Sequence, residues 1–216
     1  MPSGEAAFIA GNTALEAPPL VPELRLHLAS EVTKLWLATE EALAASGLPP
    51  PYWAFAWAGG QALARYILDH PDLVRGKSVL DIGAGSGLAA LAAARAGARQ
   101  AIAAETDPFA AAAIGMNAAA NGLAVTVETV DPIGNSCRWD VLLAGDMCYE
   151  RPLADRLVPW LGACAADGAL VLLGDPGRAY LPQRGLETLA RYLVPTPLDL
   201  EDRTSRETTV WRLTRP

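Results

Sequence analysis

A glycine-rich turn following a short apolar run is the first feature of this sequence that could bind a ligand. The run Val79-Leu80-Asp81-Ile82 leads into Gly83-Ala84-Gly85-Ser86-Gly87, after which a helical pattern begins. Glycines let the backbone turn sharply and approach a ligand closely. A phosphate-binding P-loop would end in Gly-Lys-Ser/Thr, but Leu88 and Ala89 follow Gly87 here, so this interpretation fails.

The glycine spacing also departs from the dinucleotide fingerprint Gly-x-Gly-x-x-Gly, because the third glycine comes one residue early. Asp81 precedes the first glycine by two residues. It would repel a pyrophosphate but attract the cationic amino acid end of S-adenosylmethionine. Glu105 follows the next apolar run about 20 residues on, where a carboxylate can accept hydrogen bonds from both ribose hydroxyls. Asp131 follows the third run, where an adenine amino group would lie. Together these residues predict S-adenosylmethionine as the cofactor.

Asp146 and Tyr149, just after the fourth apolar run, are the candidates for catalysis. Open α/β sheets place ligands at the carboxyl ends of their strands. Methyl transfer to an amine requires a neutral amine held near the methyl carbon with water excluded, and a free lysine has a pKa of about 10.4. A carboxylate can attract the ammonium and accept its hydrogen bond, while a tyrosine ring can wall a lysine channel. The alternative is that Asp146 caps the next helix, predicted to begin near Pro152.

The elements that must position these residues follow from the apolar pattern after Gly76, where short runs alternate with helical stretches. The runs are Ser78–Ile82, Ala101–Glu105, Val125–Glu128, Val141–Ala144 and Ala169–Leu173. The helical stretches are Leu88–Ala96, Pro108–Asn121, Leu153–Ala165 and Gln183–Tyr192. Strand followed by helix, repeated, predicts a parallel sheet covered by helices on both faces.

The end of the chain differs, because Leu198–Asp202 and Thr208–Leu213 are strand-like runs joined by a short polar turn. They predict an antiparallel hairpin at the sheet edge. The predicted fold is therefore an α/β doubly wound sheet with strand order 3-2-1-4-5-7-6 and strand 7 antiparallel.

The N-terminal part shows a different pattern. Residues 1–20 have no periodicity and predict a loose arm, whereas Pro22–Ser46 has apolar residues at helical spacing and predicts a helix that the prolines at 49–51 end. A second helix is predicted over Gln61–Asp69. We expect residues 1–50 to form an arm and helix packed on a core domain of residues 51–216.

Composition narrows the class of protein. The 216 residues favour one domain, and the net charge of −7 argues against nucleic acid or an anionic membrane as the partner. Three cysteines without a Cys-x-x-Cys pair and two distant histidines argue against a disulfide framework and a zinc site. No apolar run approaches the roughly 18 residues of a membrane helix, and no Lys or Arg precedes Arg25 as a secretory signal would require. We expect a cytoplasmic protein, by default a monomer.

Several segments resemble the seven-β-strand class of S-adenosylmethionine-dependent methyltransferases over roughly residues 50–216. Trp57-Ala58-Gly59-Gly60 and Asp146-Met147-Cys148-Tyr149 resemble the Trp-x-Gly-Gly and Asp-x-x-Tyr motifs of its protein-lysine branch. Five segments in order resemble the family of lysine methyltransferases that act on the β subunit of electron-transfer flavoprotein. They are Pro51-Tyr52-Trp53-Ala54-Phe55, Gly60-Gln61-Ala62-Leu63-Ala64-Arg65-Tyr66, Arg75-Gly76-Lys77-Ser78-Val79-Leu80-Asp81, Gly145-Asp146-Met147 with Tyr149, and Gly174-Asp175-Pro176-Gly177-Arg178.

The resemblance implies a Rossmann-like methyltransferase sheet with an N-terminal helical extension, S-adenosylmethionine as cofactor with S-adenosylhomocysteine as product, no metal, and that flavoprotein subunit as protein substrate. The cofactor residues are then Trp57, Asp81, Gly83, Ala84, Gly85, Gly87, Glu105 and Asp131. Trp57 could equally pack in the core. Tyr52 and Trp53 would form a rim for the lysine chain or pin the N-terminal helix, and Asp175 and Arg178 would contact the protein substrate or form a plain turn.

Other functions are compatible with the same fold. A small-molecule N-methyltransferase acting on a nicotinamide-like amine, a ribosomal-protein methyltransferase, and a catalytically silent binding module are the alternatives. An Asn-Pro-Pro-Tyr motif after the fourth strand would indicate methylation of adenine or of a glutamine amide, and Asp-Met-Cys-Tyr stands there instead.

Overall fold

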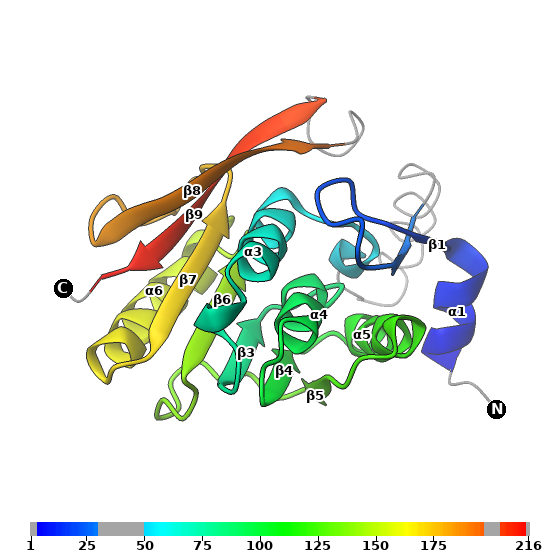
Figure 1. The fold of residues 1–216 in the computed structure, drawn as a ribbon, viewed down its shortest axis with the longest axis horizontal. Coiled ribbons are helices and arrows are strands. Elements are labelled where there is room, and N and C mark those ends of the chain that lie inside the picture. The colour runs from blue at the N-terminus through cyan, green and yellow to red at the C-terminus, as the bar shows by residue number, and fades with distance from the viewer. Residues whose placement is uncertain (1–3, 30–49, 197–203, 215–216) are drawn as a thin grey trace.

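A seven-stranded sheet forms the centre of the computed structural model, which describes residues 4–29, 50–196 and 204–214 (Figure 1). The strand order is β5-β4-β3-β6-β7-β9-β8. The strands are β3 (Ser78–Ile82), β4 (Gln100–Ala104), β5 (Thr126–Glu128), β6 (Val141–Gly145), β7 (Leu170–Asp175), β8 (Leu186–Pro195) and β9 (Ser205–Leu213). β5, β4, β3, β6 and β7 pair in parallel, and β9 pairs antiparallel with both β7 and β8. The predicted order 3-2-1-4-5-7-6 is confirmed.

Helices cover both faces of this sheet and bury alternate residues of each strand. Val79, Leu143 and Leu172 pack in one core with α3 (Ala58–Asp69) and α4 (Leu88–Arg95). Their chain neighbours Leu80, Leu142 and Val171 pack in a second core with α6 (Arg151–Ala166). α5 (Pro108–Asn121) lies beside α4 (Figure 1). Because both faces of β3, β6 and β7 are buried, their sequences are continuous apolar runs, which is why these strands could be predicted from the sequence.

The start of α3 lies directly on the carboxyl ends of β6 and β7. A Cβ at Gly59 would collide with the carbonyl oxygen of Gly174, and one at Gly174 would collide with the carbonyl oxygen of Gly59. A Cβ at Gly145 would come within 3.0 Å of Gly60. The Asp146 backbone N–H also donates to the Gly174 carbonyl at 2.9 Å. Main chain therefore packs against main chain here, which brings the residues after both strands next to the first turn of α3.

The N-terminal segment is ordered by side-chain amides of the core. Gln61 accepts a hydrogen bond from the Leu20 N–H at 3.1 Å, and Asn121 bonds both the N–H and the carbonyl of Arg25. Asn117, which is fully buried, accepts from the His27 N–H at 2.7 Å and donates to the Ser86 carbonyl at 2.8 Å. Asn117 thereby links the N-terminal segment to the glycine-rich loop.

Two predictions for the N-terminal segment are wrong. Residues 1–20 contain a helix, α1 (Gly4–Asn12), and a strand, β1 (Ala14–Glu16), and buried Ile9 anchors α1 to the core. The helix predicted from Pro22 is broken by β2 (Leu26–Leu28), which pairs antiparallel with β1. Buried leucines at 24, 26 and 28 alternate as in a strand, but 24 and 28 also fit a helix. The rest of the predicted helix, residues 30–46, lies outside the described residues, and the division into domains at residue 50 stays a prediction.

The helix predicted over Gln183–Tyr192 is also wrong, because these residues belong largely to β8. A bulge between Thr188 and Ala190 inserts an extra residue into the pairing with β9. The bulge interrupts the two-residue alternation that marks a strand, and the Leu, Glu, Ala and Arg residues of the segment favour a helix locally. The hairpin is therefore formed by β8 and β9, and Leu198–Asp202 lies outside the described residues.

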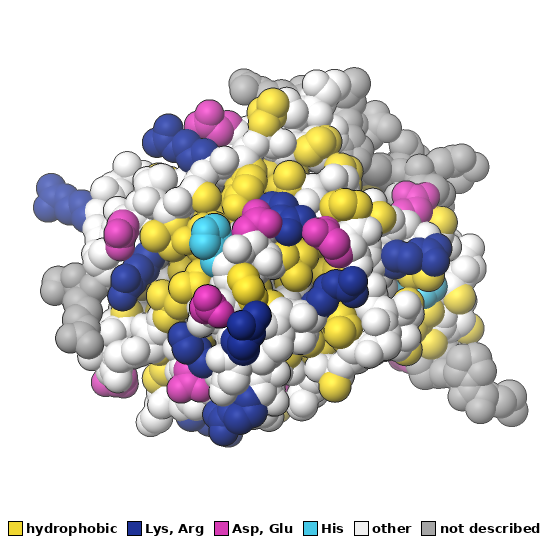
Figure 2. All heavy atoms as spheres, viewed as in Figure 1, with side chains coloured by type: hydrophobic (Ala, Val, Ile, Leu, Met, Phe, Trp, Pro, Cys, Tyr) yellow, Lys and Arg dark blue, Asp and Glu magenta, His cyan; other side chains and the backbone are white. Residues whose placement is uncertain are grey.

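The surface of the described residues mixes both signs of charge. Figure 2 shows acidic and basic side chains interspersed over the face of the molecule seen there, with hydrophobic side chains between them. Among the described residues, helices long and apolar enough to cross a bilayer are absent.

The backbone contact at Gly59 generates a prediction on stability. We predict that Gly59→Ala lowers the free energy of unfolding by about 1–3 kcal/mol, because the new methyl group must push α3 away from β7. Gly60→Ala is the matched control, since a Cβ there meets nothing within 4 Å, and helix propensity alone would raise stability by up to about 1 kcal/mol. Urea unfolding of both variants checks this; equal stability of the two would contradict it.

Candidate active site

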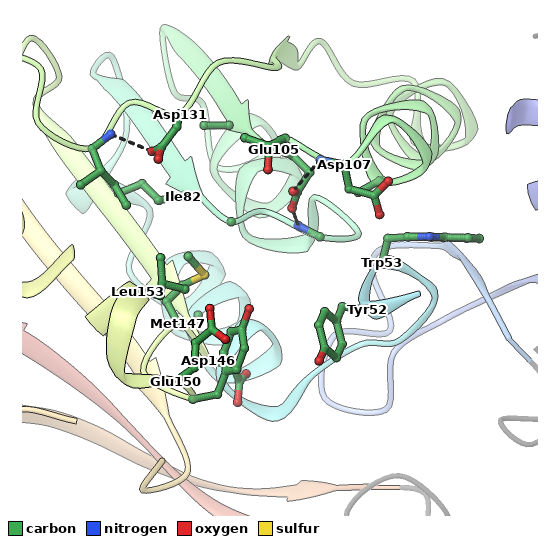
Figure 3. Close-up of a pocket in the computed structure, with 18 of the residues that line it drawn as sticks. Tyr52, Trp53, Ile82, Glu105, Asp107, Asp131, Asp146, Met147, Glu150 and Leu153 are labelled. Atoms are coloured by element: carbon green, nitrogen blue, oxygen red, sulfur yellow. Dashed lines mark hydrogen bonds between the residues drawn. The ribbon is translucent and has the colours of Figure 1, made fainter. Parts of the chain in front are cut away.

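A pocket of about 720 Å³ opens at the carboxyl ends of β3, β4 and β6. Figure 3 shows Glu105, Asp107 and Asp131 along one side and Asp146, Met147, Glu150 and Leu153 along the other, with Tyr52 and Trp53 at one end. The glycine loop lies between the two sides, because β3 is central in the sheet. Parallel strands thus bring together the predicted cofactor residues and the predicted catalytic residues.

The glycine loop has the conformation that close approach of a ligand requires. Gly83 has φ +58°, and a Cβ there would collide with the thioether of Met147. Gly87, with φ +78°, faces Ile114 of α5 at 3.1 Å from its Cβ position. The loop is tied to β4 by the Ala84 N–H, which donates to the Ala104 carbonyl at 3.2 Å. Gly83 and Gly85 line the pocket and Ala84 lines a small recess beside it, whereas Gly87 turns the chain into α4.

Asp81 is buried at the base of that recess, only 3% exposed. Its carboxylate accepts a hydrogen bond from the Ala90 N–H, in the first turn of α4, at 3.0 Å. The pKa of Asp81 is raised to about 7, chiefly by burial and to a lesser extent by the nearby Glu105 carboxylate, against the lowering effect of the hydrogen bond from the Ala90 N–H. A cation placed beside Asp81 would favour its ionised form.

Glu105 joins the glycine loop to the end of β4. One carboxylate oxygen accepts from the Gly85 N–H at 3.0 Å, and the other accepts from the Asp107 N–H at 3.2 Å. Asp107 itself caps α5 by accepting from the Phe109 N–H at 2.8 Å. Asp107 lines the pocket but was missed as a site residue, although Asp-Pro at the start of a helix is a recognisable capping signal.

Asp131 lines the pocket with its carboxylate already engaged. One oxygen accepts from the Ile133 N–H at 2.9 Å, and the other pairs with the Arg156 guanidinium of α6 at 2.6 Å. Arg156 is a second lining residue that the sequence did not indicate, because it lies mid-helix with no motif around it. The adenine contact of Asp131 stays a prediction.

Asp146 occupies a strained and highly connected position. It has φ +57°, uncommon for a non-glycine residue, and is 8% exposed. One carboxylate oxygen accepts from the Gly59 N–H at 2.5 Å and the Gly60 N–H at 3.3 Å, and the other accepts from Arg178 Nε and Nη2 at 3.0 and 2.8 Å. Burial raises the pKa of Asp146 to about 6, against the opposing effect of Arg178. Asp146 therefore caps α3, not the following helix.

Aromatic side chains form one end of the pocket. The rings of Tyr52 and Tyr149 lie 5.8 Å apart, and Tyr52 lies at the same distance from Trp57. Trp57 also donates from Nε1 to the Tyr52 carbonyl at 2.8 Å. Burial raises the pKa of the Tyr149 phenol to about 12, so it keeps its proton at neutral pH. Trp53, 2% exposed, packs in a core with Ile9, so the rim prediction suits Tyr52 better than Trp53.

Asp175 is 3% exposed and lies outside the pocket lining. Its carboxylate accepts from the N–H groups of Gly177 and Arg178, both at 2.6 Å. It shapes the turn that presents Arg178 to the pocket, and this corrects the expectation that the Asp175 side chain contacts a protein substrate. Arg178 does line the pocket, with its guanidinium 5.6 Å from the Trp57 ring centre.

The charges of the lining favour a cationic ligand. Two arginines line the pocket, and each is paired with an acid of the lining. The lining carboxylates outnumber them; they are Glu105, Asp107, Asp131, Asp146 and Glu150. S-adenosylmethionine carries a sulfonium and an ammonium group, so the charge of the pocket and its glycine loop fit this cofactor. Among the described residues, groups of three or more His, Cys, Asp or Glu placed to hold a metal ion are absent.

Comparison with known proteins agrees with this geometry. The zebrafish (Danio rerio) electron transfer flavoprotein beta subunit lysine methyltransferase is 40% identical over 213 residues, covering 95% of this chain and 81% of its own. The chain belongs to this methyltransferase family. The family model of ribosomal protein L11 methyltransferase (PrmA) matches residues 62–145, the part that carries the glycine loop and Glu105.

Solved methyltransferases share the fold. The ribosomal protein L11 methylase of Lactobacillus delbrueckii subsp. bulgaricus superposes with a TM-score of 0.54 at 20% identity, covering 79% of this chain and 83% of its own. The magnesium protoporphyrin IX methyltransferase of Synechocystis PCC 6803, solved with bound SAM, gives 0.53 at 14% identity over 73% and 78% of the two chains. The predicted seven-stranded methyltransferase fold is confirmed.

Glu105 provides a test of the cofactor side of the pocket. We predict that Glu105→Ala weakens S-adenosylmethionine binding by about 1–3 kcal/mol, the loss expected for charge-assisted hydrogen bonds to the ribose. Glu128→Ala is the control, because Glu128 ends the adjacent strand β5 and pairs with Arg138 outside the pocket lining. Titration calorimetry on both folded variants measures the change; unaltered affinity in Glu105→Ala would refute the assignment.

Asp81 provides a pH test. Its raised pKa of about 7 leaves it neutral in mildly acidic solution, so it attracts a cationic ligand fully only above pH 7. We predict that affinity for S-adenosylmethionine is about tenfold higher at pH 7 than at pH 5.5, since ligand binding must then release the proton of Asp81. Asp81→Asn should bind weakly with a flat profile over this range. Parallel profiles for the two proteins in calorimetry would count against the role of Asp81.

Proposed function

We propose that this protein is an S-adenosylmethionine-dependent protein-lysine N-methyltransferase whose substrate is the β subunit of electron-transfer flavoprotein. One observation carries the proposal: a single acidic pocket joins the glycine loop and Glu105 to Asp146, Tyr149 and Arg178. The relatives named for this activity match the chain on both sides of that pocket, over 95% of its length.

The alternative substrates have less support. The ribosomal protein L11 methyltransferase model ends at residue 145, just before Asp146 and Tyr149. The match therefore includes the cofactor loop and leaves out the residues proposed to hold the amine.

The chain's residues divide the work between binding and orientation. When bound, S-adenosylmethionine supplies an electrophilic methyl group on a sulfonium. Gly83 and Gly85 would present main chain to its amino acid end, Asp81 would balance the ammonium there, and Glu105 would accept from the ribose hydroxyls. Trp57 and Asp131 border the same space.

On the other side, the chain must accept a lysine ammonium and let it lose a proton to solvent. The nitrogen lone pair would then form the new N–C bond as the bond from the methyl carbon to sulfur breaks, with S-adenosylhomocysteine as the leaving group. Asp146 is proposed to attract the ammonium and to accept a hydrogen bond that orients the amine. The Tyr149 phenol, protonated at neutral pH, can hydrogen-bond the nitrogen while the rings of Tyr149 and Tyr52 exclude water from the lysine chain.

The activity itself is tested with purified electron-transfer flavoprotein. We predict that the protein transfers methyl groups to lysines of the β subunit, detected by intact mass and peptide mapping. Ribosomal protein L11 and nicotinamide serve as alternative acceptors. Methylation of either in place of the flavoprotein subunit would replace the proposal with that activity.

Two variants test the amine-holding residues. Asp146→Asn keeps an oxygen for the Gly59 and Gly60 amides but removes the charge, and we predict that it slows single-turnover methylation by about 10²-fold or more. Tyr149→Phe should act more mildly, since its ring remains. S-adenosylmethionine affinity should change little in both, which calorimetry checks. Near-normal turnover in folded Asp146→Asn would show that the amine is held elsewhere.

Localisation in the cytoplasm and a monomeric state stay predictions. Cell fractionation and light scattering of the purified protein test them.

A further inference from the structure

The carboxylate of Asp146 has all its hydrogen-bonding positions occupied. A carboxylate offers about four acceptor sites. Here one oxygen accepts from two backbone amides, and the other accepts from two N–H groups of Arg178. A lysine ammonium can therefore reach this carboxylate in the proposed way only after one of these donors has left.

Arg178 is the donor that can leave. The Gly59 and Gly60 amides belong to the first turn of α3, which is pressed against Gly174, so they could withdraw only if the helix unwound. The Arg178 side chain extends from the loop after β7, lines the pocket and is 20% exposed. Its backbone is held in place by the Asp175 carboxylate, so a rotation of the side chain alone would free the oxygen.

An exchange of Arg178 for a lysine also preserves the local charge. Asp146 is only 10% exposed in its side chain, and a buried carboxylate without a counter-ion is strongly destabilising. A guanidinium replaced by an ammonium leaves one positive charge beside it while the substrate binds. The guanidinium is also the more weakly hydrated of the two cations, which suits it to rest in a half-buried site beside the Trp57 ring.

We propose that Arg178 occupies the substrate-ammonium position in the resting enzyme and yields Asp146 to the substrate lysine, so that it favours lysines carried by a protein over small free amines. This inference rests on the proposed function. A lysine presented by a docked protein brings binding energy from contacts remote from the reacting nitrogen, and that energy can displace Arg178. A small amine has only its own ammonium with which to compete.

The exchange is tested first on the unmodified protein. Phenylglyoxal reacts with accessible guanidinium groups, and peptide mapping by mass spectrometry measures the rate at each arginine. With S-adenosylhomocysteine present, n-butylammonium serves as a lysine side-chain probe. Raised to concentrations high enough to compete with the guanidinium, it should speed modification of Arg178 several-fold. The exposed Arg75 and Arg138 are internal references and should react at unchanged rates. Unchanged or slower modification of Arg178 as n-butylammonium is added overturns the proposal.

The selectivity is tested by kinetics near pH 8.5, well above the pKa of about 6 that Asp146 has beside Arg178. The quantity measured is the ratio of kcat/KM for Nα-acetyl-lysine methylamide to kcat/KM for the flavoprotein β subunit. Arg178→Gln should raise this ratio about tenfold. Arg138→Gln, which removes one charge from an ion pair outside the pocket lining, should leave it unchanged. A merely structural role would lower both kcat/KM values together, and an unchanged or lower ratio overturns the proposal.

Failure of the proposed function has a different signature. The wild-type protein would then leave the flavoprotein subunit unmethylated, while the phenylglyoxal experiment still reports whether Arg178 gives way to an ammonium. The same experiment decides the proposal should Arg178→Gln not fold.

Discussion

The burial of one carboxylate, that of Asp146, connects most of what defines the active site. A buried charge requires a full set of hydrogen-bond donors or a counter-ion. The structure provides both, with two amides from the start of α3 and the guanidinium of Arg178. The amides can reach Asp146 only because Gly59 and Gly174 let a helix and a strand touch through their main chains. The hydrogen bonds to Asp146 and the contact between Gly59 and Gly174 thus fix three features together. These are the position of α3, the path of the loop after β7 and the floor of the substrate pocket.

The hydrogen bonds on the two sides of the pocket join residues that lie at different separations along the sequence. On the cofactor side, Glu105 bonds the loop residue Gly85, 20 positions away within one strand–helix–strand unit. On the substrate side, Asp146 bonds Gly59 and Arg178, which are 87 and 32 positions away. The first relation is a recurrent local motif, so the sequence predicted it. The second depends on how β6, β7 and α3 meet, which a local pattern does not specify.

The same distinction explains which parts of the fold the sequence predicted. Strands β3, β4, β6 and β7 are largely buried on both faces and bounded by turns, so their apolar runs predicted them to within a residue or two. β2 lies outside the main sheet and β8 forms its edge, and in both segments the residue pattern fits a helix as well as a strand. The alternation of Leu24, Leu26 and Leu28 is too short to exclude a helix, and the bulge at Thr188 hides the alternation of β8. For site residues, motifs placed Asp175 at the correct sheet edge. They could not show that its carboxylate would bond the N–H groups two and three residues later.

The way in which the N-terminal segment is attached bears on how its sequence can vary. Gln61, Asn117 and Asn121 bond the main-chain groups of residues 20, 25 and 27, not their side chains. Any residue other than proline offers the same N–H group, so these hydrogen bonds do not depend on the side chains at positions 20, 25 and 27. Substitutions can therefore accumulate in this segment at exposed positions while its course over α5 is kept. Asn117 and Asn121 cannot be substituted as freely. An aspartate in either place would lose the N–H group that Asn117 donates to the Ser86 carbonyl or that Asn121 donates to the Arg25 carbonyl.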